Sequence, residues 1–234
     1  MGGWDWSVFL QDTGGGENYI QWLLRAWGWT LAVAATALAV ALVVGSVMGI
    51  LRTTPSRALV FVGDAWTEVF RNIPLLVQIF LWYHVVPGLF PVMLKMPPYV
   101  LVVLAIGFFT SARVAEQVRA GIQSLPKGQR YAGLAMGLTL PQTYRYVLLP
   151  MAYRIIIPPM TSESMNIVKN TSVAFAVSIG ELMMFTLQAS EETSRIKEIY
   201  LVVTIAYFIS AFTVNRVAGL IESRVRVPGM IGSK

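Results

Sequence analysis

Two ionisable and two amide side chains between positions 163 and 170 stand in a mostly apolar part of the chain. Glu163, Asn166 and Asn170 share one helical stripe, and Lys169 is about a quarter turn away from it, with Thr171 just beyond. A charge at the centre of a membrane helix costs roughly 2.5–3.5 kcal/mol on insertion scales, so each such residue is a functional candidate. The stripe offers a carboxylate acceptor beside amide donors. The alternative is a polar network, or a Glu–Lys pair, that only holds helices together.

Two arginines extend this set. The guanidinium of Arg113 presents paired N–H donors that bind a carboxylate in bidentate fashion. Its alternatives are an i,i+3 pair with Glu116 or extension toward lipid headgroups. Arg71 comes shortly before Pro74, where a helix loses a hydrogen bond and frees backbone carbonyls. Contact with a ligand or a gate is one interpretation of Arg71, and pairing with Glu68 at helical spacing is the favoured one.

The composition places these residues in a membrane protein. Of the 234 residues, 56% are hydrophobic and only 13% are charged, and the mean hydropathy is +0.62. A soluble domain of this size needs more charge on its surface. The excess of 18 Lys+Arg over 12 Asp+Glu indicates basic cytoplasmic loops rather than a nucleic-acid partner. The lack of Cys excludes thiolate sites, and a single His excludes a multi-histidine zinc site.

The hydropathy pattern predicts an all-α integral membrane protein with one domain, residues 1–234, and about five spans. The first span follows from 26 uncharged residues between Arg25 and Arg52, enough to cross a ~30 Å hydrocarbon core. Ala41, Gly45 and Gly49 within it form a small-residue stripe that lets a neighbouring helix approach closely. The predicted spans are approximately 26–51, 64–90, 96–118, 150–177 and 199–221.

The distribution of Lys and Arg predicts the orientation. With the N-terminus outside and the C-terminus inside, the outer segments hold Lys95, Arg195 and Lys197. The inner segments carry a larger set, namely Arg52, Arg57, Arg119, Lys127, Arg130, Arg145, Arg224, Arg226 and Lys234. Positive charge concentrates on the cytoplasmic side of membrane proteins. The loop of approximately 119–149 is therefore expected in the cytoplasm.

That loop has an internal order of its own. Ser124 before Pro126 predicts a helix start, and Gly137 predicts the stop of a helix over Lys127–Met136. Thr139 and Gln142 fit a capping box that opens the next helix. The short helix combines small residues with Tyr, Leu and Met, which suits docking onto another protein. An interfacial helix lying on lipid headgroups is the alternative.

The same loop carries a family motif. Its YAG, three residues, Gly, nine residues and V-L-L-P match the spacing of the EAA loop of ABC importer permeases over residues 131–150. Further resemblance lies in FRNIPLLVQ at 70–78, SARVAEQVRAGIQSLPKGQ at 111–129 and VKNTS at 168–172. The chain resembles permeases of the polar amino acid uptake family, in particular those of bacterial glutamate/aspartate importers. Tyr131 stands where the motif has Glu, and Gly133 stands where it has the second Ala.

The resemblance implies a type I ABC importer permease fold with a cytoplasmic coupling helix, in the bacterial inner membrane. It implies a second homologous permease subunit, two ATPase subunits that hold ATP and Mg, and a periplasmic substrate-binding protein. This chain has no GxxxxGK[ST] loop and would bind no cofactor itself. The residues expected to contact the ATPase are Lys127, Gly128, Tyr131, Ala132, Gly133, Met136, Gly137 and Leu138.

The implied function is inward movement of an acidic amino acid by alternating access. Glu163 would accept the substrate ammonium, and Asn166, Asn170 and Thr171 would bind its α-carboxylate. Relatives for other amino acids often have a neutral residue at Arg113, so Arg113 would bind the second carboxylate of glutamate or aspartate. The main alternative is a neutral or basic amino acid. An intramembrane enzyme would need clustered His or paired carboxylates, and a passive channel would need no docking loop.

Overall fold

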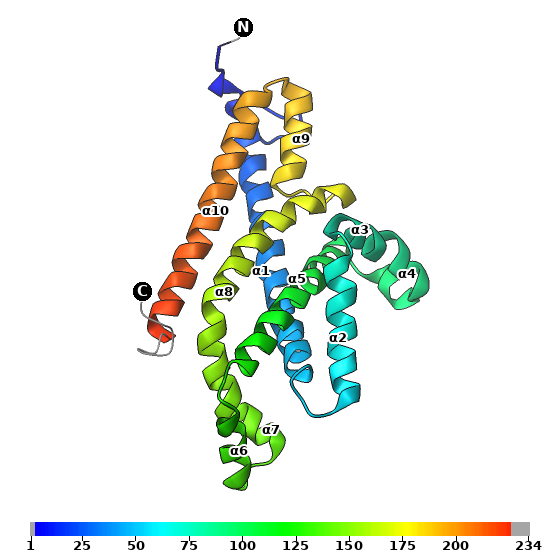
Figure 1. The fold of residues 1–234 in the computed structure, drawn as a ribbon. Coiled ribbons are helices and arrows are strands. Elements are labelled where there is room, and N and C mark those ends of the chain that lie inside the picture. Colours follow the sequence, from blue (N-terminus) through cyan, green and yellow to red (C-terminus); the bar gives the residue numbers. More distant parts are fainter. Residues whose placement is uncertain (1–2, 226–234) are drawn as a thin grey trace. The chain divides into compact units, whose positions relative to one another are not determined.

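The computed structural model describes residues 3–225, and the regular elements of this part are helices (Figure 1). Two basic residues used in the orientation argument, Arg226 and Lys234, lie outside the described residues. The long helices are α1 (Tyr19–Leu51), α2 (Arg57–Asn72), α5 (Pro98–Gln123), α8 (Leu149–Asn170) and α10 (Ile196–Val225). The shorter ones are Trp6–Leu10, α3 (Leu75–Phe80), Leu81–Val85, α4 (Val86–Leu89), Pro91–Lys95, α6 (Lys127–Ala135), α7 (Leu140–Thr143), Tyr144–Leu148, Thr171–Val177 and α9 (Leu182–Thr193).

The helices divide between two compact units. The first unit contains residues 3–39, 74–107 and 165–213. In it α9 and α10 lie beside the N-terminal part of α1, as Figure 1 shows. Its core is formed by the buried side chains Val8, Phe9, Tyr19, Leu23, Ala26, Leu182, Phe185, Ala189, Ile199, Val203 and Ala206.

A buried carboxylate organises the first unit. Glu181 has no exposed surface, and its side chain accepts hydrogen bonds from the backbone N–H groups of Met183 and Met184 at 2.9 and 3.0 Å. The hydroxyl of Tyr207 donates to the same carboxylate at 2.8 Å. Glu181 is thus the N-cap of α9, and it satisfies donors that a helix start otherwise leaves unpaired. The sequence analysis left α9 outside any span and missed this cap, although a Glu directly before an apolar run is the signal.

The second unit contains residues 40–73, 108–164 and 214–225. Its core is formed by Ala41, Val114, Val118, Ile122, Leu125, Tyr144, Leu148, Ala152 and Ile156. The predicted small-residue stripe of α1 is confirmed here. A Cβ at Gly45 would lie 2.5 Å from the Cβ of Val114, and one at Gly49 would lie 2.6 Å from that of Val118. Because no side chain fits in that space, α1 and α5 pack with their backbones close together.

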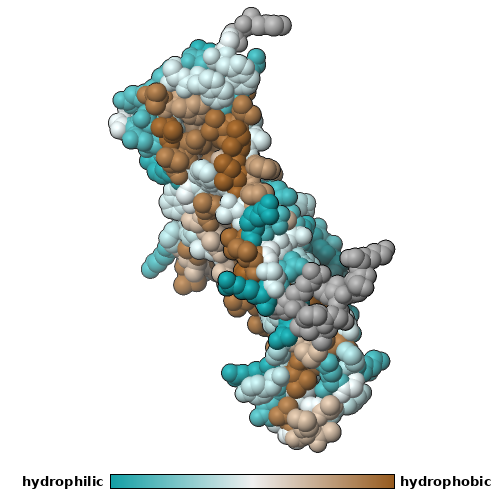
Figure 2. All heavy atoms as spheres, turned by 90° about the vertical axis from the view of Figure 1, so that its left-hand side faces the viewer, coloured by the Kyte–Doolittle hydropathy of each residue, from teal (hydrophilic) through white to brown (hydrophobic). Residues whose placement is uncertain are grey.

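Within residues 3–225, three helices are long and apolar enough to cross a membrane, or up to five segments if each of two bent helix pairs is one span. The three are Tyr19–Leu51, Pro98–Gln123 and Ile196–Arg224. The predicted span 64–90 is interrupted, since α2 ends at Asn72 and α3 begins at Leu75. Ile73 is extended there because a residue before proline is driven away from the helical region. Figure 2 shows hydrophobic residues gathered over a broad part of one face.

The predicted start of α6 at Lys127 is confirmed, but the predicted N-cap is wrong. Ser124 does not cap α6, because its hydroxyl donates back to the carbonyl of Gly121 at 2.8 Å, in the last turn of α5. Pro126 is the N-cap residue, and α6 begins at Lys127. The predicted stop at Gly137 is confirmed, with φ +85° and the Leu138 N–H donating to the Gly133 carbonyl. The capping box of Thr139 and Gln142 is confirmed at the start of α7.

Candidate functional site

Arg113 and Glu163 come together in the second unit, from α5 and α8. The Nη1 atom of Arg113 lies 3.8 Å from Oε2 of Glu163. The side chain of Arg113 is 45% exposed and that of Glu163 only 11%. The distance exceeds that of a good charge-assisted hydrogen bond, which is about 2.7–2.9 Å. The two charges therefore attract each other while most of the guanidinium N–H donors stay available.

The alternative partner of Arg113, Glu116, is not used. Glu116 instead accepts a hydrogen bond from Nη1 of Arg71 at 2.9 Å. The guanidinium of Arg113 also lies 5.3 Å from the ring centroid of Phe109 on the same helix, a cation–π distance. Phe109 and Glu163 together hold the Arg113 head on the side of α5 that faces α8. The sequence predicts Arg113 and Glu163 separately as substrate contacts. The structure brings the two side chains together from two different helices.

The other residues of the α8 stripe differ in their surroundings. Asn166 and Asn170 are partly buried, and Lys169 is exposed. Among residues 3–225 no hydrogen bond or ion pair is found for these three side chains, so their polar groups remain open to a ligand. Thr171 is buried and its hydroxyl donates to the Val168 carbonyl at 2.8 Å. The alternative pair of Glu163 with Lys169 does not form, since Glu163 pairs with Arg113.

Arg71 belongs to a different cluster. Its Nη2 atom lies 2.8 Å from Glu68 and its Nη1 atom 2.9 Å from Glu116, which gives it two acidic partners. The pairing with Glu68 expected from the sequence is confirmed. Asn72 also donates to Glu68, at 2.8 Å. These contacts satisfy the guanidinium without a ligand.

Arg52, at the centre of this cluster, was not predicted from the sequence as a functional residue. Its side chain is only 6% exposed, and its Nε donates to Asp64 at 2.6 Å while its Nη1 donates to Thr67 at 3.2 Å. The available signal was Gly63, where a Cβ would lie 2.5 Å from Cγ of Arg52, so only Gly admits that side chain. We call the following set the α2–α5 ion network: Arg52, Asp64, Glu68, Arg71, Glu116 and Arg119.

The segment with the family motif folds into three short consecutive helices, α6, α7 and Tyr144–Leu148. Gly133 is buried, and a Cβ there would lie 2.8 Å from Cγ2 of Thr143. Its small size therefore lets α6 pack against the last residue of α7. Apolar side chains are exposed on α6 and at its C-cap: Tyr131 is 67% exposed, Ala132 is exposed, and Met136, directly after α6, is 77% exposed. Large apolar side chains held outward on a short capped helix favour a partner surface.

Among residues 3–225 no group of three or more His, Asp or Glu side chains is close enough to hold a metal ion. The carboxylates named above are instead paired with arginines or with backbone N–H groups.

Comparison with known proteins shows which family the chain belongs to. Residues 41–227 match the model of the binding-protein-dependent transport system inner membrane component. The chain belongs to that family. The match covers α1 from Ala41 onward, the α2–α5 ion network, the Arg113–Glu163 pair and the motif-bearing loop. This chain is therefore a membrane-embedded translocation subunit and not an enzyme.

Curated relatives cover nearly the whole chain. It is 44% identical over 99% of its length to the glutamate/aspartate import permease protein GltJ of Escherichia coli strain K12, of which 98% is covered. It is 33% identical over 84% of its length to the probable glutamine ABC transporter permease protein GlnM of Bacillus subtilis, of which 89% is covered.

Solved structures share the fold. An amino acid ABC transporter crystallised with histidines matches with a TM-score of 0.75 and 27% identity, covering 88% of this chain and 95% of that one. The MetNI methionine ABC transporter in an inward-facing conformation matches with a TM-score of 0.77 and 20% identity, covering 89% and 98%. The chain has the type I ABC importer permease fold predicted from its sequence.

Proposed function

We propose that this chain is the permease subunit of a bacterial importer that moves glutamate or aspartate across the inner membrane. The Arg113–Glu163 pair carries the proposal. A dicarboxylic amino acid needs a cationic group for its side chain and an anionic group for its ammonium. A half-exposed guanidinium 3.8 Å from a mostly buried carboxylate offers both within one amino acid's length. The 44% identity to a permease named for glutamate and aspartate supports the same substrate class.

The proposed roles follow the environments of the side chains. Arg113 binds a substrate carboxylate in bidentate fashion, and Glu163 accepts the ammonium. Asn166, Lys169 and Asn170 belong to the first unit, and their amide and ammonium groups are proposed as substrate contacts of that unit. Arg71 and Thr171 have partners within the chain, so their contribution to binding is smaller.

The proposed assembly pairs this chain with a second homologous permease subunit, two ATPase subunits and a periplasmic binding protein. The N-terminus is then periplasmic and the C-terminus cytoplasmic, which places α6 on the side of the ATPases. Tyr131, Ala132 and Met136 form the contact face, with Lys127, Gly128 and Leu138 at its margins. Gly133 allows close packing inside the segment, and Gly137 ends its helix. A stacking tyrosine takes the place of the Glu found in the family motif.

Uptake by the complete transporter in proteoliposomes tests the substrate role. Arg113→Gln is expected to lower glutamate uptake at least about tenfold, because one bidentate charged contact is worth more than 1.4 kcal/mol. Glu163→Gln is expected to do the same by removing the ammonium partner. Arg119→Gln is a matched control on α5, since Arg119 is 39% exposed and its partner Asp64 also pairs with Arg52. Unchanged glutamate uptake in Arg113→Gln would contradict the assignment of Arg113 as a substrate-binding residue.

A neutral substrate is the second candidate, because one relative is named for glutamine. Competition distinguishes the two. If glutamine displaces labelled glutamate from the wild-type transporter at equal concentration, Arg113 does not select a second carboxylate. For an acidic substrate, glutamine competes only after Arg113 is replaced by Tyr.

The coupling role has its own test. Tyr131→Ala is expected to uncouple ATP hydrolysis from uptake, because it removes the largest exposed side chain of α6. Tyr146→Ala is the control, as Tyr146 is 62% exposed and lies outside α6. Equal uptake per ATP hydrolysed in both variants would remove Tyr131 from the coupling surface.

A further inference from the structure

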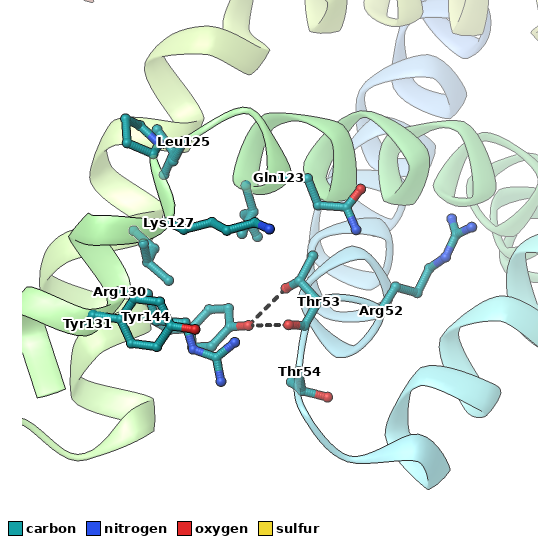
Figure 3. Close-up of a pocket in the computed structure, with 12 residues that line it drawn as sticks. Arg52, Thr53, Thr54, Gln123, Leu125, Lys127, Arg130, Tyr131 and Tyr144 are labelled. Atoms are coloured by element: carbon teal, nitrogen blue, oxygen red, sulfur yellow. Dashed lines mark hydrogen bonds between the residues drawn. The ribbon is translucent and has the colours of Figure 1, made fainter.

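A polar cavity of about 450 Å³ lies beside α6 in the second unit. Figure 3 shows Lys127, Arg130 and Tyr131 of α6 on one side of it and Thr53 and Thr54 on the other. Its remaining lining residues are Arg52, Ile122, Gln123, Leu125, Pro126, Tyr144 and Leu148. The lining holds three basic side chains and no acidic one. An anion is therefore the complementary ligand.

The charges of this cavity are not all neutralised from within. Arg52 is engaged by Asp64, and in Figure 3 its guanidinium points away from the Tyr144 side of the cavity. Lys127 and Arg130 have no ion-pair partner among residues 3–225. The Nε atom of Arg130 is buried and has no hydrogen-bond partner in that part of the chain. A buried donor without a partner destabilises the fold, and a bound anion would supply the missing acceptor.

The walls of the cavity are held in place. The Tyr144 hydroxyl donates to the Thr53 carbonyl at 2.7 Å and lies 3.0 Å from the Thr53 hydroxyl (Figure 3). This contact joins the end of α1 to the segment that follows α7. The hydroxyls of Thr53 and Tyr144 therefore stay at fixed positions beside the two unpaired cations.

A second, apolar cavity of about 390 Å³ adjoins the first and shares Thr54 and Tyr144 with it. Its apolar lining includes Ile50, Leu59, Leu140 and Leu149. Leu59 on α2 is 42% exposed, and Phe61, two positions further along α2, is 72% exposed, as expected of side chains that face lipid. The two cavities together place a cationic pocket at the end of an apolar groove.

We propose that these two cavities bind one anionic phospholipid, with its phosphate at Lys127 and Arg130 and an acyl chain along Leu59 and Leu149. The charge of the first cavity selects an acidic headgroup, and the apolar groove selects a lipid over a free phosphate. This site goes beyond the proposed transport function. It joins α6 to α2 through a lipid, so the bilayer composition acts on the segment that carries the family motif.

Native mass spectrometry of the transporter purified with its partner subunits tests the binding. Phosphatidylglycerol and phosphatidylcholine are offered at equal concentration. Arg130→Gln is expected to reduce retained phosphatidylglycerol at least about fivefold and to leave phosphatidylcholine unchanged. Arg57→Gln is the control, since Arg57 is an exposed arginine of α2 outside both cavities. Equal loss in both variants would overturn the proposal, because it indicates general attraction to negative surfaces.

The groove is tested separately. Leu59→Trp fills it and is expected to reduce retained phosphatidylglycerol, whereas Phe61→Trp, on the same helix but outside the groove, is expected not to. Inorganic phosphate and glycerol phosphate, added at millimolar concentration, distinguish a soluble ligand. If they displace phosphatidylglycerol while Leu59→Trp has no effect, the ligand is a soluble phosphate. If Arg130→Gln releases the ATPase subunits in neutral lipid, an ATPase side chain occupies the cavity; either result contradicts the lipid site.

Discussion

Two charged clusters in the second unit differ in how completely they are satisfied. In the α2–α5 ion network, Arg52 and Arg71 have carboxylate partners at 2.6–2.9 Å, and Arg71 has two of them. In the Arg113–Glu163 pair the charges are 3.8 Å apart, with one contact between them. A network whose charges are matched within the chain holds helices together. A loose pair with unused donors has room for a ligand that carries charges of both signs.

The comparison predicts that stability and uptake depend on different arginines. The largest loss of stability is expected at Arg52, whose side chain is 6% exposed. Arg52→Gln removes a buried guanidinium that Asp64 and Thr67 accept from, and it is expected to lower the free energy of unfolding by about 2 kcal/mol. Thermal unfolding of the detergent-solubilised transporter measures it, as a fall in Tm of roughly 4–8 °C. Arg57→Gln is the exposed control; equal Tm values in the two variants would show that the network does not stabilise the fold.

A smaller loss is expected at Arg71, because its side chain is 43% exposed and Glu116 retains Arg52 at 3.6 Å. Arg71→Gln is expected to lower the free energy of unfolding by about 1 kcal/mol or less. The KM for glutamate uptake is expected to stay unchanged, since Arg71 is engaged by Glu68 and Glu116. A rise in KM without a change in Tm would move Arg71 from the network to the binding site.

The smallest effect on stability is expected at Arg113. Its half-exposed guanidinium and the long distance to Glu163 predict a change in unfolding free energy within about 0.5 kcal/mol for Arg113→Gln. The same variant is the one expected to lose uptake. A Tm loss as large as that of Arg52→Gln would make the Arg113–Glu163 pair a structural ion pair and would erase the difference between the two clusters.

The sequence predicted much of this arrangement because several signals in it are local. Each of these signals depends on residues that are close in the sequence. They are the length of the apolar runs, the small-residue stripe from Ala41 to Gly49, the left-handed Gly137 and the capping box at Thr139. The pairing of Arg71 with Glu68 was predictable for the same reason, as one helical turn sets it. The family motif also spans only 20 residues. Ser124 was misassigned because two adjacent helix ends competed for its hydroxyl.

The tertiary structure decided which residues of distant segments contact one another. Arg113 pairs with Glu163, fifty positions away, rather than with Glu116, because Glu116 is drawn to Arg71 and Arg52 of other helices. The cavity beside α6 exists because Tyr144 reaches back to Thr53 at the end of α1. By itself the sequence determined that this chain crosses a membrane, which family it resembles and which charges stand in apolar segments. Only the packed helices decided which charges neutralise each other, since that depends on which helix faces meet.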